Sequence, residues 1–231
     1  GAAIALGAPY LVVARFVYTD VLHLFGMLLN LWVFGGLLGT RPGDRYSRDL
    51  WGVAFGLTLI FLLNTKYSAY LYAAALGGWI LWERRDLLRD RAFWIGVGLG
   101  TLGLLPVVVW NALHGWISFR WQLAHFAMGS PGSEEVDLLL RWAGNARHAA
   151  VYLTPPLFIG GLIGLGRLRD SGERLLTAVA LAIVLPVALS AANSPRNLTT
   201  GWVLLLLLAG SRLRADRSAR RILTLGLASV L

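Results

Sequence analysis

Residues 21–39 read VLHLFGMLLNLWVFGGLLG, a run without a single charged side chain. An α-helix needs about 20 apolar residues to cross the hydrocarbon core of a bilayer. Comparable apolar runs recur along the chain between short polar segments, at 1–17, 50–63, 66–82, 93–111, 149–166, 175–192, 201–211 and 221–231. The pair 50–63 and 66–82 is open to two interpretations, two helices or one element broken around residues 64–66. The pattern predicts an all-α fold, a polytopic transmembrane helix bundle of about 8–9 spans, as a single transmembrane domain over residues 1–231.

The overall composition favours the same fold class. Apolar residues make up 57% of the chain and charged residues 14%, with a mean hydropathy of +0.64, whereas a soluble domain carries about 25% charged residues. The net charge of +9 lies in short loops and not on one face with interleaved aromatic residues, which argues against nucleic acid as a partner. The chain has no cysteine, so disulfides and thiolate metal sites are excluded. It begins Gly-Ala-Ala without an initiator Met, and its last apolar run reaches the final residue, so we expect a fragment that lacks N-terminal helices.

The basic residues predict an orientation. If the apolar runs alternate in direction, 15 of the 21 Lys and Arg residues fall in the loops 40–49, 83–92, 167–174 and 211–221. The positive-inside rule places these loops in the cytoplasm. The opposite, extracytoplasmic face then carries residues 18–20, 64–67, 112–148 and 193–200. Many Arg, Ala, Leu and Gly residues with one Lys indicate a GC-rich bacterium, so we expect a multi-pass protein of the bacterial inner (plasma) membrane, with membrane lipids around it.

The outer-face loop region, about 112–148, is the longest stretch without a predicted span. Within 114–126, Trp116, Phe119, Leu123 and Phe126 follow at spacings of three, four and three residues, which places them on one face of a helix. We therefore predict a short amphipathic helix lying at the membrane interface, with its aromatic residues at headgroup depth. A flexible turn over 129–135 and a second short helix over 136–143 are expected to follow.

Two charged residues stand at the outer ends of predicted spans. A charge at membrane depth costs roughly 2.5–3.5 kcal/mol on insertion scales, so such a residue tends to be paired, hydrated or functional. Asp20 either caps a helix N-terminus or serves as a general base or metal ligand; the two interpretations are compatible. Lys66, the only lysine, either extends its amine to the interface or contacts a lipid phosphate, with Tyr67 beside it.

Two further groups of polar residues belong to the same face. Asn111, His114, Trp116, Arg120 and Gln122 gather where an apolar run ends, and Trp and Arg side chains can stack on or grip a sugar phosphate. Arg196 is a single cation on a short outer loop. The sequence has no Gly-x-Ser-x-Gly, Walker-type loop or His-Glu-x-x-His motif.

Three of these segments together resemble a known family. Residues 110–119 read WNALHGWISF, residues 65–68 read TKYS after an apolar run, and Asp20 precedes another. In this order they resemble the motifs of polytopic glycosyltransferases of the GT-C fold, in the dolichyl-phosphate-mannose-protein mannosyltransferase-like group that includes bacterial aminoarabinose transferases. The acidic first outer loop of that family has no counterpart among these residues.

The resemblance implies an activity and site residues. A sugar would move from a polyprenyl-phosphate carrier to a lipid, protein or glycan acceptor on the extracytoplasmic side, with inversion at the anomeric carbon. Asp20 would be catalytic, and the substrates would be bound by Lys66, Tyr67, Asn111, His114, Trp116, Arg120, Gln122 and Arg196. No cofactor is certain, and a divalent metal stays open without assigned ligands. The alternatives are a multispan transporter or lipid flippase, and a non-catalytic membrane scaffold.

Overall fold

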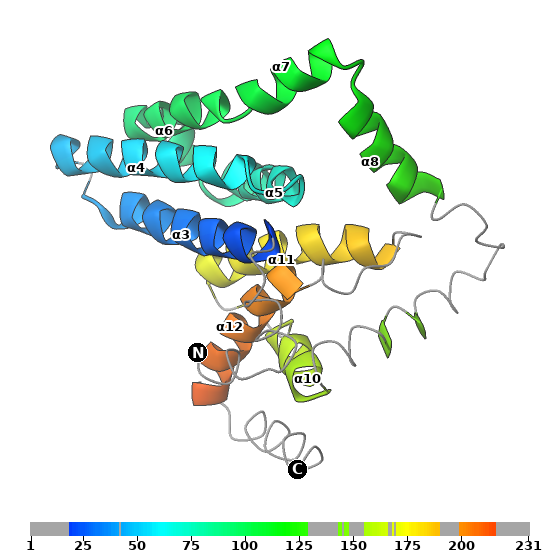
Figure 1. Ribbon diagram of the computed structural model, residues 1–231. Coiled ribbons are helices and arrows are strands. Elements are labelled where there is room, and N and C mark those ends of the chain that lie inside the picture. The colour runs from blue at the N-terminus through cyan, green and yellow to red at the C-terminus, as the bar shows by residue number, and fades with distance from the viewer. Residues whose placement is uncertain are drawn as a thin grey trace. The chain divides into compact units, whose positions relative to one another are not determined.

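The computed structural model of the protein describes residues 19–41, 43–128, 143–144, 146–147, 155–165, 168, 170–189 and 199–215. Every element named within these ranges is a helix (Figure 1). They are α3 (Thr19–Gly39), α4 (Arg45–Leu63), α5 (Ser68–Glu83), the 3-10 helix η1 (Arg85–Arg89), α6 (Arg91–Leu102), α7 (Leu105–Leu113), α8 (Ile117–Met128), α10 (Pro155–Gly164), α11 (Ser171–Leu189) and α12 (Thr199–Ala215). The predicted all-α class is confirmed for this part of the chain.

Three helical stretches are long and apolar enough to cross a membrane, namely Asp20–Gly39, Arg45–Leu63 and Arg91–Leu113. They support the expectation of a membrane protein, while the larger number of spans stays a prediction. The predicted runs 1–17 and 221–231 lie outside the described residues, as do the turn over 129–135 and nearly all of 136–143.

The structure resolves three of the predicted runs in detail. Residues 50–63 and 66–82 form two helices, α4 and α5, joined by the turn at residues 64–67, which decides between the two interpretations. The run 93–111 falls within the candidate span Arg91–Leu113, inside which the helix is interrupted at Gly103 and Leu104, between α6 and α7. Pro106 stands in the first turn of α7, where a residue without an amide proton is tolerated and the preceding backbone is restricted.

Contacts divide the chain into two compact units, residues 17–121 and residues 1–16 with 122–231. The single domain over 1–231 stays a prediction. The second unit packs α12 against α10 and α11. A Cβ atom added at Gly164 of α10 would lie 2.1 Å from the carbonyl oxygen of Leu205 in α12. The backbones of α10 and α12 are therefore in direct contact at this point.

Glycines set the packing of the unit at residues 17–121. A Cβ atom added at Gly52 of α4 would lie 2.2 Å from the carbonyl oxygen of Ala92 in α6, and one at Gly56 would lie 2.7 Å from that of Gly96. The numbers rise together on both helices, so α4 and α6 run parallel. Small residues four apart let backbones approach closely, which is how helices associate in lipid. In the sequence α5 lies between α4 and α6. Two parallel neighbours joined through one intervening helix fit a chain that crosses the membrane back and forth.

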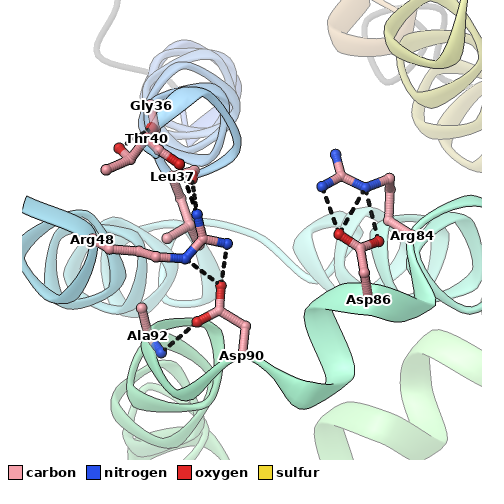
Figure 2. Close-up of polar contacts among 8 residues, drawn as sticks. All are labelled: Gly36, Leu37, Thr40, Arg48, Arg84, Asp86, Asp90 and Ala92. Atoms are coloured by element: carbon pink, nitrogen blue, oxygen red, sulfur yellow. Dashed lines mark hydrogen bonds and ion pairs between the residues drawn. The ribbon is translucent and has the colours of Figure 1, made fainter. Parts of the chain in front are cut away.

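The arginine loops of this unit meet at one end of its helices. The Arg48 guanidinium pairs with Asp90 and also donates to the carbonyl oxygen of Thr40 at 2.8 Å (Figure 2). The Asp90 carboxylate in turn accepts from the amide of Ala92 at 2.9 Å and caps α6. One ion pair thus joins the end of α3 to the starts of α4 and α6, and the turn at residues 64–67 lies at the other end of α4.

Candidate functional site

The start of α3 and the turn at residues 64–67 bring two predicted site residues together. Lys66 donates from Nζ to Oδ1 of Asp20, across 46 positions in the sequence. The Asp20 side chain is 10% exposed and that of Lys66 is 25% exposed. Asp20 lies inside the first turn of α3, so the N-cap interpretation is wrong; a carboxylate in the first turn still complements the helix dipole. The pair is a charged site at the helix ends opposite the arginine loops.

His23, one turn further along α3, fixes this arrangement. Its Nδ1 atom lies 3.1 Å from Oγ1 of Thr65 and its Nε2 atom lies 3.0 Å from Oγ of Ser68. The ring is fully buried, and both nitrogens have hydrogen-bond partners. His23 therefore ties α3 to the turn that carries Lys66. It was not predicted as part of the site, although its spacing of three residues from Asp20 places both on one helix face.

A second buried polar group lies seven residues further along the same face. Asn30 donates to the carbonyl oxygen of Phe55 at 3.1 Å and to Oγ1 of Thr58 at 2.8 Å, and it accepts from the Tyr72 hydroxyl at 2.6 Å. Asn30 and Tyr72 are both fully buried. These bonds connect α3, α4 and α5 and satisfy both ends of the amide, so the network holds the helices that carry Asp20 and Lys66 in register.

The WNALHGWISF segment forms a sharp corner between α7 and α8 (Figure 1). Gly115 and Trp116 have φ angles of 63° and 59°, in the left-handed region that suits glycine and strains other residues. The Asn111 carbonyl accepts from the Trp116 amide at 2.7 Å, and its side chain accepts from the Ser118 amide at 3.2 Å. Asn111 is fully buried and also donates to the Val107 carbonyl. It therefore shapes the corner, and its predicted contact with substrate would have to be indirect.

His114 presents a basic nitrogen on the exposed side of this corner. Its ring stacks on Trp110 with centroids 4.3 Å apart and planes 12° apart. Its Nδ1 atom lies 2.7 Å from the Trp110 carbonyl oxygen, and because a carbonyl only accepts, Nδ1 carries the proton. In the neutral ring Nε2 is then an acceptor. The side chain is exposed, so it is available to a hydroxyl group or a proton.

An aromatic cluster connects the corner to the turn that carries Lys66. Phe119 of α8 contacts Tyr67 at a ring-centroid distance of 5.7 Å, Trp116 at 5.9 Å and Tyr70 at 6.5 Å. Trp116 itself is 47% exposed. Trp116 precedes α8 and is not part of it, so its predicted place on the helical face is wrong. α7 ends at Leu113 before the left-handed turn, and α8 begins after the turn at Ile117.

The remaining predicted residues are less closely joined. Arg120 is exposed and Gln122 half-buried on α8, the helix that follows the corner. Leu123, predicted on its apolar face, is 70% exposed. The Phe126 side chain and Arg196 lie outside the described residues. The structure thus brings Asp20, Lys66 and Tyr67 together and connects them through Phe119 to Trp116.

The open question of a divalent metal gains no ligand set from the described ranges. They contain no group of three or more His, Cys, Asp or Glu residues that could hold a metal ion. Asp20, the one carboxylate at the site, is already paired with Lys66. The donors present in the described residues do not fit a metal ion.

Comparison with protein-family models, curated proteins and solved structures finds no match to this chain.

Proposed function

We propose that the protein is a membrane glycosyltransferase with a GT-C-like bundle of about 8–9 spans. In this proposal it transfers a sugar from a polyprenyl-phosphate carrier to a lipid, protein or glycan acceptor on the extracytoplasmic side of the plasma membrane. The observation that supports it best is the Asp20–Lys66 pair, a base and a cation held next to each other at the ends of α3 and α4. The aromatic cluster around Phe119 lies beside them.

The charge pair supplies what this reaction requires. An acceptor O–H or N–H attacks the anomeric carbon, the bond from that carbon to the phosphate oxygen breaks, and the electron pair leaves with the polyprenyl phosphate. Lys66, a compact cation on a flexible stem, neutralises the charge that develops on the phosphate. Asp20 receives the acceptor's proton once Lys66 has turned toward the phosphate. Until the donor enters, the ion pair holds the two groups next to each other.

The aromatic residues suit the sugar. Trp116 is about half exposed beside Phe119, and aromatic faces pack against the apolar faces of sugar rings. His114 offers Nε2 to a hydroxyl group, held in place by its stack on Trp110. These residues would orient the donor, while the charge pair carries out the transfer.

Sugar transfer in vesicles tests the proposal. The purified protein, reconstituted in lipid vesicles, would receive undecaprenyl phosphate carrying radiolabelled mannose or, separately, aminoarabinose, with total membrane lipid and protein as acceptors. Asp20→Asn should lower transfer by about 100-fold or more, the usual contribution of a general base. Asp44→Asn is the matched control, because it removes one carboxylate at the far end of α4 and keeps a good N-cap. Undiminished transfer by Asp20→Asn would refute the assigned role.

A transporter or lipid flippase is the second candidate, favoured by the buried Asn30 in the middle of α3, because polar groups at membrane depth often mark a transport path. Its amide is, however, fully bonded to Phe55, Thr58 and Tyr72. The same vesicles, loaded with a fluorescent lipid and no donor, would reveal flipping directly.

A further inference from the structure

A polar cavity lies at the end of the unit that holds the arginine loops. Its volume is ≈ 560 Å³. Its walls come from the start of α4, from η1 and from the start of α6, and they are Arg45, Arg48, Asp49, Asp86, Arg89, Asp90, Arg91 and Ala92.

Most of the charges in this cavity are compensated within it. Arg48 and Asp90 form its most buried pair, with side chains 16% and 13% exposed (Figure 2). Arg91 lies 3.6 Å from Asp49. Asp86 accepts from Arg84, which is drawn beside it in Figure 2, and this hydrogen bond lowers the pKa of the Asp86 carboxyl below its ordinary value. Each of the cavity's three acidic residues is therefore paired with an arginine.

Two cations remain. Arg45 and Arg89 are exposed, line the same cavity from α4 and η1, and have no ion pair among the residues that the structure describes. Guanidinium groups bind phosphate through paired hydrogen bonds, so two of them beside a neutralised floor favour an anionic ligand such as a phosphate ester.

An apolar groove adjoins the charged cavity. It has a volume of ≈ 390 Å³ and lies between α5 and α6, with side chains of α4 as its floor. Leu88 and Phe93 line the groove, while residues 89–92 between them line the cavity, so the two meet at η1 and the start of α6. The Trp94 indole donates to the Leu88 carbonyl at 2.8 Å and fixes this junction. A ligand that fills both has a charged head and a hydrocarbon chain.

We propose that the Arg45–Arg89 cavity and the adjoining groove bind an anionic phospholipid of the cytoplasmic leaflet, with its phosphate between the two arginines and an acyl chain between α5 and α6. The depth agrees, because Tyr46 and Trp82 are 77% and 82% exposed at the same end, as aromatic residues at headgroup level are. Basic pockets between helices on the cytoplasmic side bind anionic headgroups for the same reason. This site is separate from the Asp20–Lys66 pair and does not depend on the proposed function.

Lipid binding to the purified protein in detergent micelles tests the headgroup site. Native mass spectrometry would follow dioleoyl-phosphatidylglycerol against dioleoyl-phosphatidylcholine. The double variant Arg45→Gln/Arg89→Gln should weaken phosphatidylglycerol binding by about tenfold or more, since each basic residue near a membrane surface contributes to the attraction. The matched control Arg41→Gln/Arg85→Gln removes the same charge at the same end but outside the cavity, and should change binding less than twofold. Equal losses in both double variants would overturn the proposal.

A second pair of variants tests the acyl chain. Gly77 lines the groove and Gly78 does not, and a Cβ atom at either position would meet nothing within 4 Å. Gly77→Leu should therefore weaken phosphatidylglycerol binding by severalfold while Gly78→Leu leaves it unchanged. Inorganic phosphate, added at millimolar concentration, should not displace the lipid. If phosphate displaced the lipid and Gly77→Leu left phosphatidylglycerol binding unchanged, the cavity would be a site for free anions, and the proposed phospholipid site would be overturned.

Discussion

Removing Lys66 and removing Asp20 from their ion pair should lower the stability of the protein by unequal amounts. Lys66→Met leaves the Asp20 carboxylate, 10% exposed, without its cation. Breaking a buried pair from one side costs about 3–5 kcal/mol, and partial exposure lowers this figure, so we expect about 2 kcal/mol of lost stability. Asp20→Asn leaves Lys66, whose side chain is 25% exposed and can turn its amine to water, so we expect about 1 kcal/mol.

The double variant separates the pair from its surroundings. Once both charges are gone, no unpaired charge is left behind, so Asp20→Asn/Lys66→Met should cost less than the two single variants added together. The expected coupling is about 1–2 kcal/mol, within the range found for residues in contact. Reversible unfolding in mixed micelles, followed by circular dichroism as the fraction of denaturing detergent rises, gives the three free energies on one scale.

Additive costs would refute this reasoning. If the two single variants sum to the double variant within about 0.5 kcal/mol, the charges do not interact in the membrane-embedded protein. The proposed catalytic arrangement would then lose its central observation. A coupled pair together with unchanged sugar transfer by Asp20→Asn would instead identify the pair as a purely structural link between α3 and the turn at residues 64–67.

Three further predictions concern the helices that position the site, each read from the same micelle unfolding experiment. Gly56→Leu should destabilise by about 1–3 kcal/mol, because its Cβ atom would lie 2.7 Å from the Gly96 carbonyl oxygen, whereas Gly98→Leu meets nothing within 4 Å and should not. Gly115→Ala should cost about 1 kcal/mol for the left-handed φ of 63° and speed hydrogen exchange at the corner. Asn30→Leu should lower the unfolding free energy by about 0.6–1.7 kcal/mol, from the average to the maximum found for side-chain hydrogen bonds in a membrane protein. The loss should be smaller in a Tyr72→Phe background, where no buried hydroxyl is left without its acceptor. Equal effects of Gly56→Leu and Gly98→Leu would contradict the packing of α4 against α6. A neutral Gly115→Ala would contradict the strained turn. If Tyr72→Phe did not reduce the cost of Asn30→Leu, the hydrogen-bond network would be contradicted.

The sequence predicted the helices of residues 17–121 well because their signal is local. Nineteen uncharged residues at 21–39 leave a helix as the way to satisfy the backbone in lipid, and α3 covers the same range. The break after Leu102 was missed, because hydropathy is continuous across Gly103 and Leu104. The signal was Pro106, which marks the first turn of a new helix.

The site was predicted only in part because sequence spacing does not tell which helix face is covered. Asp20 and Lys66 were both selected as charges at span ends, and their pairing follows from the antiparallel packing of α3 on α4. His23 and Asn30 were not predicted as part of the site. Their positions three and ten residues after Asp20 place all three on one face, which the structure shows to be buried.

The WNALHGWISF segment combines two kinds of residue that sequence alone treats as one motif. Asn111 and Gly115 are required by the corner itself, the first by its bonds to Trp116 and Ser118 and the second by its left-handed backbone. His114 and Trp116 are instead exposed by that corner, although the His114 ring also bonds to the Trp110 carbonyl and the Trp116 ring contacts Phe119. A substitution at Asn111 should therefore disturb folding and activity together, whereas His114→Ala, which removes an exposed side chain, should lower the unfolding free energy less than Asn111→Ala does and still lower transfer. That contrast separates residues that shape the site from residues that act in it.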